Sequence, residues 1–212
     1  MNESDAARRF VSFEGLDGAG KTTHLERARA WLEAAGERVV TTREPGGTPL
    51  GEAVRSWFLT HQMSPDTEAL LVFAARREHL ERVIWPALAR GAWVLCDRFT
   101  DATRAYQGGG RGLPAARIEA LAEWVHGRFE PALTFLFDVP RSTAQGRLTG
   151  RDGDRIEAES QSFHERVRAR YLELAAQAPE RVHVIDATAD VETVWQSVRA
   201  RLADHRARLD QR

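Results

Sequence analysis

Residues 15–23 read Gly15-Leu16-Asp17-Gly18-Ala19-Gly20-Lys21-Thr22-Thr23, and they match the pattern G-x-x-x-x-G-K-[ST] up to Thr22. An apolar run, Phe10-Val11-Ser12-Phe13, precedes this stretch, and a helix-like stretch, 24–35, follows it. A phosphate-binding loop (P-loop) needs this context, because the strand directs the loop and the helix presents free N–H groups to an anion. We therefore expect a nucleoside triphosphate site, with Lys21 reaching the β- and γ-phosphates and the Thr22 hydroxyl binding Mg²⁺.

The composition is that of an ordinary globular protein. The chain has 212 residues, a formal net charge of −1 and a single cysteine, Cys96. One cysteine excludes an internal disulfide and fits a reducing compartment. There is no apolar run long enough to span a membrane and no sign of a secretion signal. We expect one cytoplasmic domain, 1–212, that binds neither nucleic acid nor membrane.

Strand-like and helix-like stretches alternate along the chain. Further strands are predicted at 37–42, 93–96, 133–137 and 182–185, and helices at 24–35, about 66–89, 114–126, 141–148, 159–177 and 190–208. This alternation predicts an α/β fold with a five-stranded parallel sheet flanked by helices. Two segments rich in glycine and arginine, 107–112 and 149–155, are expected to be loops that a ligand orders.

Four groups of residues carry candidate chemistry. Arg43-Glu44-Pro45-Gly46-Gly47-Thr48 follows the second strand, where Arg43 could grip a phosphate or form a surface pair with Glu44. Asp97-Arg98 follows the third strand, either as a Mg²⁺ ligand beside a phosphate-binding arginine or as a salt-bridged strand end. Phe73 and Arg77 lie four apart on one helix face, where they could hold a base or lie in the core and in solvent, respectively. Asp17 either contacts a second substrate or points outward.

These residues, taken in order, make the chain resemble the thymidylate kinases. The resemblance covers nearly the whole chain and runs through Phe13 to Thr23, Arg43 to Thr48, Phe73 to Arg77, Asp97-Arg98, Ala105 to Gly108 and Asp154 to Glu157. It implies a P-loop nucleoside monophosphate kinase fold with a mobile lid, here about 147–157. It also implies transfer of the γ-phosphoryl group of ATP to dTMP, with Mg²⁺, in a homodimer.

The resemblance assigns roles to individual residues. Phe73 would stack on thymine, and Arg77 would donate to its O4. Thr103, Tyr106 and Gln107 would lie at the base and sugar, with Tyr106 disfavouring a ribose. The dTMP phosphate and sugar would be held by Arg43, Glu44, Pro45, Arg98 and Asp17. Mg²⁺ would be bound by Thr22 and Asp97. Asp17, Lys21 and Arg98 would take part in catalysis.

The family divides on where its mobile catalytic arginine lies. Some members carry it in the P-loop, at the position of Gly18 in this chain, and others carry it in the lid. The glycine makes this chain similar to the lid-arginine type, which is commonly bacterial. The lid offers Arg147, Arg151 and Arg155, and the spacing before Asp154-Arg155 departs from the usual arginine pattern, so it leaves the choice among them open. Arg151 is the favoured catalytic arginine and Arg147 the second candidate. Phe99 also departs from the tyrosine or histidine usual after Asp-Arg.

Other functions remain as alternatives. The nearest is a kinase for another nucleoside monophosphate or for a deoxynucleoside, but a nucleoside acceptor would leave Arg43 and Arg98 without a phosphate. A regulatory GTPase should carry an Asn-Lys-x-Asp motif, and the chain has none. A DNA-dependent ATPase should present a basic face, whereas the net charge is −1.

Overall fold

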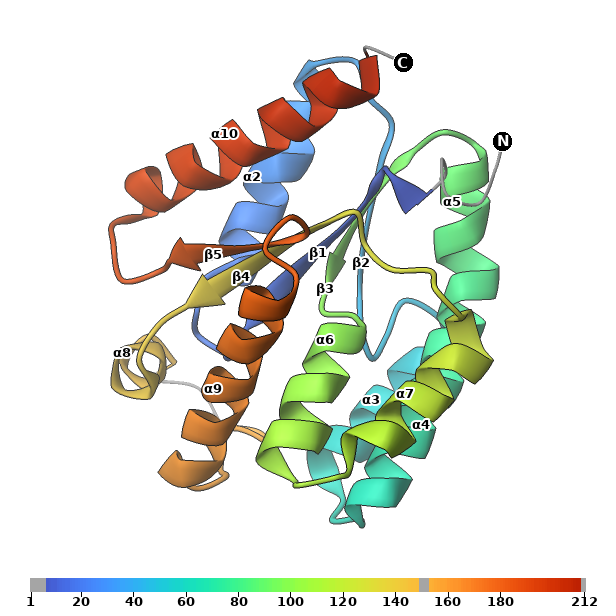
Figure 1. The fold of residues 1–212 in the computed structure, drawn as a ribbon, viewed down its shortest axis with the longest axis vertical. Helices are drawn as coiled ribbons and strands as arrows, with labels where there is room; N and C mark the ends of the chain where they lie inside the picture. Colours follow the sequence, from blue (N-terminus) through green and yellow to red (C-terminus); the bar gives the residue numbers. More distant parts are fainter. Residues whose placement is uncertain (1–6, 149–152, 211–212) are drawn as a thin grey trace.

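Five parallel strands form one sheet, in the order β2-β3-β1-β4-β5, within residues 7–148 and 153–210, which the computed structural model describes (Figure 1). The strands are β1 (Phe10–Gly15), β2 (Val39–Arg43), β3 (Trp93–Asp97), β4 (Leu133–Asp138) and β5 (Val182–Asp186). The predicted five-stranded parallel sheet is therefore confirmed. Because the chain adds strands on both sides of β1, a crevice forms at the carboxyl ends of β1 and β3.

The central strands are buried on both faces. Along β1, Val11 and Phe13 pack on one side of the sheet, and Phe10 packs on the other. β3 alternates in the same way, and its Cys96 is a buried free thiol. Burial raises the pKa of Cys96 well above its usual range, so this thiol is inert core rather than a nucleophile.

Helices cover both faces of the sheet. α2 (Lys21–Ala34) and α10 (Val191–Asp210) lie together on one face, blue and red in Figure 1. The opposite face is covered by α4 (Pro65–His79), η1 (Leu80–Ile84), α5 (Trp85–Ala89), α6 (Thr100–Thr103), η2 (Arg104–Gly110), α7 (Ala115–His126) and α9 (Gln161–Gln177). No helix in the described part of the chain is both long and apolar enough to cross a membrane.

Two further helices lie in the described part of the chain, α3 (Pro49–Thr60) and α8 (Arg141–Gly146). α3 was not predicted. Its start nevertheless carries ordinary helix signals, since the Thr48 hydroxyl accepts from the Gly51 N–H at 2.9 Å and Pro49 occupies the first turn. Val54 and Phe58 bury its inner face.

The glycine-rich segment expected to be a loop is helical up to Gly110, and that expectation is wrong there. η2 is a π-helix that packs against α9. A Cβ at Gly109 would lie 2.6 Å from Cβ of Arg170, and a Cβ at Gly110 would lie 2.5 Å from the Phe163 ring. The glycines therefore serve close packing between helices. The stretch predicted as one helix over 66–89 is continuous, but η1 interrupts its α-helical pattern.

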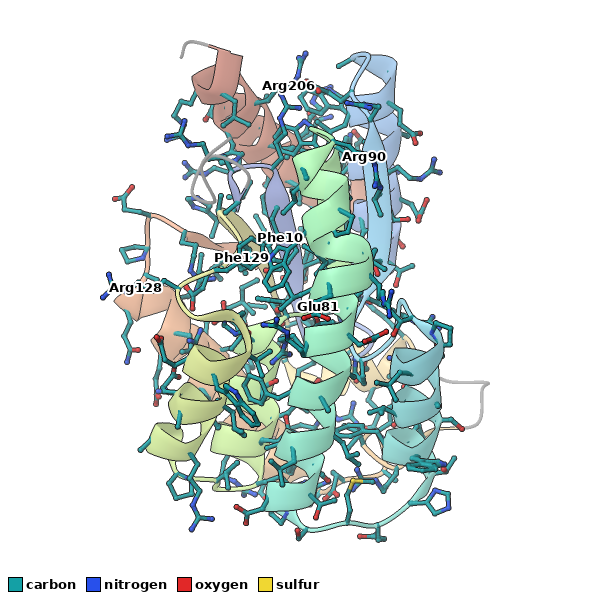
Figure 2. All side chains as sticks on the ribbon, turned by 90° about the vertical axis from the view of Figure 1, so that its right-hand side faces the viewer. Phe10, Glu81, Arg90, Arg128, Phe129 and Arg206 are labelled. Carbon is teal, nitrogen blue, oxygen red and sulfur yellow. The ribbon has the colours of Figure 1, made fainter. Side chains whose placement is uncertain are left out.

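A cluster of aromatic side chains packs around the segment that follows β3. Phe10 and Phe129, labelled together in Figure 2, stack with ring centroids 5.4 Å apart. Phe99 meets the Phe10 ring edge-on at 5.0 Å. Phe99 comes two residues after the end of β3, so this cluster fixes the backbone of the segment that follows the strand.

Candidate active site

The P-loop connects β1 to α2 in the geometry that its pattern predicts. Gly15, Gly18 and Gly20 all have positive φ angles, between +82° and +133°. Lys21 begins α2, and its buried ammonium donates to the carbonyls of Gly15 at 3.2 Å and Leu16 at 3.0 Å. These bonds hold the lysine over the loop in which an anion would lie, and burial lowers its pKa.

Two P-loop glycines are required by neighbouring backbone as well as by φ. A Cβ at Gly15 would lie 2.5 Å from the Phe137 carbonyl oxygen at the end of β4. A Cβ at Gly18 would lie 2.3 Å from the Ala144 carbonyl oxygen on α8. A side chain at position 18 would therefore require α8 to move.

Asp97 ends β3 beside the P-loop strand, in register with Phe13. Its Oδ1 is buried and has no hydrogen-bond partner among the described residues. An unsatisfied carboxylate oxygen in a polar crevice fits a cation site. Thr22 lies one residue into α2, on the exposed side of the loop.

A cavity opens next to the P-loop, between the carboxyl ends of β2 and β3 and the helices beyond; we call it the acceptor cavity. Its walls come from the P-loop, the turn after β2, α3, α4, the segment after β3, η2 and the segment around 154–156. The residues that line it are Asp17, Glu44, Pro45, Arg55, Phe58, Leu59, Val72, Arg76, Arg98, Phe99, Ala102, Thr103, Tyr106, Gln107, Asp154 and Ile156.

Asp17 and Arg98 join the P-loop to this cavity. Arg98 Nη2 donates to Asp17 Oδ1 at 2.8 Å, and Lys21 Nζ lies 4.0 Å from the same oxygen. Burial opposes ionisation of Asp17, but the charges of Arg98 and Lys21 outweigh it and hold its pKa well below the usual range. Asp17 thus lines the cavity and does not point outward, and its contact with a second substrate stays a prediction.

Arg98 is held in an unusual backbone conformation. Its φ angle is +74°, which is rare for a residue with a side chain and costs energy unless the surroundings enforce it. Its N–H donates to the Phe13 carbonyl at 3.0 Å, and the next N–H, of Phe99, donates to Glu14 Oε1 at 2.7 Å. Glu14 also accepts from the Tyr171 hydroxyl at 2.8 Å. Burial raises the pKa of Glu14 to about 8.

Arg76 is a completely buried side chain in the cavity wall, and the sequence analysis did not identify it. Its guanidinium lies 4.7 Å from the Phe73 ring centroid and 5.0 Å from that of Phe99. Nε donates to Glu44 Oε2 at 2.7 Å, and Nη2 donates to the Thr103 hydroxyl at 3.1 Å. Nη1 is buried and has no hydrogen-bond partner among the described residues.

The predicted pair Phe73 and Arg77 is wrong by one residue. Val72 and Arg76, also four apart, line the cavity. Phe73 is core, and Arg77 is half-exposed, donating to Glu81 at 2.7 Å and to the Val125 carbonyl at 2.9 Å. Glu81 belongs to η1, which continues α4, and Figure 2 shows it on the outer side of this continuous helix. Successive helical residues differ by about 100° in direction, so a shift of one residue carries a side chain out of the site.

Arg55 of α3 is a second lining residue that was missed, because α3 itself was not predicted. Burial lowers its pKa, and so do the charges of Arg43 and Arg98. Arg43 does not line the cavity and instead pairs with Glu52 at 2.8 Å. Arg55 therefore lies near the charges of Arg98, which pairs with Asp17, and of Arg43, which pairs with Glu52. An anion bound beside Arg55 would relieve the repulsion that remains.

The other predicted acceptor residues do line the cavity. Thr103 accepts from Arg76, Gln107 donates to the buried Glu68 at 3.0 Å, and the Arg98 guanidinium lies 4.7 Å from the Tyr106 ring centroid. The Tyr106 hydroxyl is buried without a hydrogen-bond partner among the described residues. Glu44 and Pro45 form the wall next to Arg55.

The lid arginines differ in what holds them. Arg155 donates to the Phe58 carbonyl at 2.9 Å and to Glu68 at 2.8 Å, which fixes the segment after the lid against α3 and α4. Arg147 donates to the Ala187 carbonyl at 2.9 Å. Arg151 lies outside the described residues.

A P-loop that shares a crevice with an arginine-lined cavity defines a phosphotransferase whose acceptor is a small anionic molecule. The family model for thymidylate kinase matches residues 13–198, so the chain belongs to the thymidylate kinase family.

Individual relatives agree with this membership. The chain is 59% identical over 189 residues to a thymidylate kinase of Cupriavidus pinatubonensis, an alignment that covers 88% of this chain and 93% of the relative. It is 55% identical over 203 residues to a thymidylate kinase of Burkholderia cenocepacia, covering 93% and 98%. The crystal structure of thymidylate kinase from Ehrlichia chaffeensis matches with a TM-score of 0.75 at 36% identity, covering 91% of this chain and 97% of that one.

Proposed function

We propose that the crevice divides into a donor half, the P-loop, and an acceptor half, the cavity next to it. As a member of the thymidylate kinase family, the chain transfers the γ-phosphoryl group of ATP to dTMP, giving dTDP and ADP. The observation that carries the proposal is the arginine lining of the acceptor cavity, in which burial and the charge of Arg98 lower the pKa of Arg55 and Arg76 Nη1 has no hydrogen-bond partner among the described residues.

In the donor half, the backbone N–H groups at the start of α2 would hold the ATP phosphates. Lys21 would exchange its bonds to the Gly15 and Leu16 carbonyls for bonds to the β- and γ-phosphates. Thr22 and Asp97 would hold Mg²⁺, and the unsatisfied Asp97 Oδ1 supports this role. Mg²⁺ bound there would neutralise negative charge on the phosphate oxygens.

In the acceptor half, Arg55 and Arg98 would hold the dTMP phosphate, and Arg43 would approach it by leaving Glu52. Arg98 would then stand between the two nucleotides, because it also binds Asp17 in the P-loop. Asp17 would face the 3′-hydroxyl region. No general base is needed, since the attacking phosphate oxygen is already anionic.

At the other end of the cavity, Arg76 Nη1 would donate to the O4 carbonyl of thymine, the role first expected of Arg77. The base would lie against Val72 and Phe99, with Thr103 and Gln107 near its edge. Tyr106, packed under the sugar, would disfavour a ribose 2′-hydroxyl. The Arg76 fork supplies only donors, so it suits a carbonyl and not an amino group.

The arginine that reaches the transferred phosphoryl group would come from the lid. The collision of any Cβ at Gly18 with the Ala144 carbonyl supports this, because the P-loop has no room for it. Arg155 is committed to Glu68, which leaves Arg151 as our choice and Arg147 as the second candidate. Lid closure would also exclude water that hydrolyses ATP.

We further propose a homodimer. Trp57, Leu70 and Trp124 are large apolar side chains that are 58%, 54% and 81% exposed, and they lie on α3, α4 and α7. α3 and α7 both pack against α4, so these helices form one side of the molecule (Figure 1). A second copy covering this side would remove the apolar surface from water. Sedimentation at micromolar concentration should give twice the mass of the chain.

Release of ADP from ATP tests the proposed function directly. The purified protein would be supplied in turn with dTMP, dUMP, dCMP, AMP, thymidine or single-stranded DNA. We expect strong stimulation by dTMP and a weaker effect of dUMP, because one methyl group contributes only about 1–3 kcal/mol of discrimination. Stimulation by thymidine would contradict the proposed phosphate site, and stimulation by DNA would contradict the acceptor cavity altogether.

A further inference from the structure

We propose that His79 and Thr42 are positioning residues that act through Glu44 on Arg76, and that this chain of contacts sets which base the acceptor cavity takes. The inference rests on the proposed function, in which Arg76 meets the base. His79 is the last residue of α4 and is completely buried, and Thr42 lies in β2. Neither residue lines the cavity.

The contacts form one continuous line from β2 to the cavity. Thr42 Oγ1 lies 2.6 Å from His79 Nε2, and His79 Nδ1 lies 2.9 Å from Glu44 Oε1. The other Glu44 oxygen, Oε2, accepts from Arg76 Nε at 2.7 Å. Glu44 thus divides its two oxygens between His79 and Arg76.

The charge of Glu44 decides which atom donates in the hydrogen bond between His79 and Glu44. Burial opposes ionisation, but the Arg76 charge and the His79 hydrogen bond outweigh it and hold the pKa of Glu44 below its ordinary value. An ionised carboxylate only accepts hydrogen bonds, so Nδ1 of His79 carries a proton and donates. The imidazole therefore occupies Oε1 and keeps it from Arg76.

This occupancy decides how Glu44 pairs with Arg76. A free carboxylate next to a guanidinium tends to take two of its nitrogens at once. With Oε1 bound to His79, only Nε of Arg76 is taken, and Nη2 remains with the Thr103 hydroxyl. Nη1 is then the nitrogen left for the substrate, in a guanidinium plane fixed on both sides. Without His79, Glu44 is free to take Nε and Nη2 together, and the plane turns away from Thr103.

The turn after β2 packs closely against the outer end of this contact line. Gly47, with φ +74°, approaches so closely that a Cβ there would lie 2.5 Å from Thr42 Oγ1 and 2.6 Å from His79 Nε2. The second glycine of the Arg-Glu-Pro-Gly-Gly-Thr motif thus packs directly against the Thr42–His79 bond. His79, Glu44 and Arg76 are themselves buried, so the loss of a His79 bond should reach Arg76.

The experiment compares three substitutions of His79 in the whole enzyme. His79→Asn keeps a donor near the place of Nδ1, His79→Gln reaches toward Thr42 instead, and His79→Leu keeps neither bond. We expect His79→Leu and His79→Gln to raise the KM for dTMP by about tenfold, the loss typical of one hydrogen bond to a charged group, with kcat and the KM for ATP within about twofold. His79→Asn should restore most of the dTMP KM.

A second readout separates positioning from stability. Relative kcat/KM for dCMP against dTMP should rise by about tenfold in His79→Leu, because a displaced Arg76 no longer opposes the 4-amino group. Thr42→Val, which breaks only the outer bond, should show the same change to about threefold. His164→Leu, the loss of another buried histidine on α9, is the control and should leave both ratios unchanged.

Equal dTMP kinetics in His79→Asn and His79→Leu, or an unchanged dCMP ratio in both His79→Leu and Thr42→Val, would overturn the positioning role. These outcomes differ from a failure of the proposed function, which would show as absent stimulation by dTMP in the unsubstituted protein.

Discussion

The donor and acceptor halves adjoin within one crevice, yet they are built from different parts of the chain. The P-loop is a contiguous segment, 15–22, whose properties come from backbone φ angles and helix N–H groups. The acceptor cavity is made of side chains from seven separate segments, held in place by buried ion pairs such as Arg76–Glu44. A backbone site can be recognised from a short pattern, whereas a side-chain site depends on the rotation of every helix that contributes to it.

The largest effect is expected from a residue that belongs to neither half. If the lid supplies the catalytic cation, Arg151→Ala should lower kcat by about 10³-fold and change the KM for dTMP little, because such an arginine acts on the transition state. Steady-state kinetics with both nucleotides measure this. Arg147→Ala is the matched variant, and a larger loss there than in Arg151→Ala would transfer the role to Arg147.

The next largest effect tests the register of the acceptor half. Arg76→Lys keeps a charge for Glu44 but loses the planar fork, so kcat/KM for dTMP should fall by about 10²-fold. Arg77→Lys, one residue further along, should stay within about twofold, because its side chain pairs with Glu81 at the surface. The reverse order of effects would restore Arg77 as the base-reading residue.

The same contrast explains what could be predicted from the sequence. The strands and the P-loop were predictable because their signals are local: buried apolar runs, and glycines before Lys-Thr. Phe73-Ala74-Ala75-Arg76-Arg77 offers two adjacent arginines, and no local signal says which one faces inward. Arg55 could have been found had Thr48-Pro49 been interpreted as a helix start.

In the donor half, even a methyl group at position 18 should weaken ATP binding. In Gly18→Ala, the methyl group meets the Ala144 carbonyl and the residue keeps a positive φ, which together should cost about 1–3 kcal/mol of unfolding free energy. Calorimetric titration should show weaker ATP binding and unchanged dTMP binding. If dTMP binding weakened equally, the two halves would not be separable in the way we describe.

The smallest effect concerns a feature that the two halves share. A buried histidine packs beneath each half. His24 of α2 stacks on Phe137 behind the P-loop. His126, at the end of α7, lies beside Phe99 and is hydrogen-bonded to Thr100. Burial lowers the pKa of each from 6.5 to about 4, with a smaller contribution from nearby arginines. The folded state therefore binds fewer protons than the unfolded state between these values.

Stability from these groups is present above pH 6.5 and is lost as the pH falls toward 4. Between about pH 7.5 and about pH 5, each histidine should remove on the order of 1–2 kcal/mol of unfolding free energy. Urea unfolding of His24→Gln and of His126→Gln measures this contribution. In each variant, the loss of unfolding free energy between the two pH values should be smaller than in the unsubstituted chain by that amount. If the two histidines contribute similar losses of unfolding free energy, the core beneath the P-loop and the core beneath the acceptor cavity respond alike to acid. The difference between the two halves would then be confined to the crevice. An unchanged pH dependence in both variants would show that these histidines are not the source of acid sensitivity.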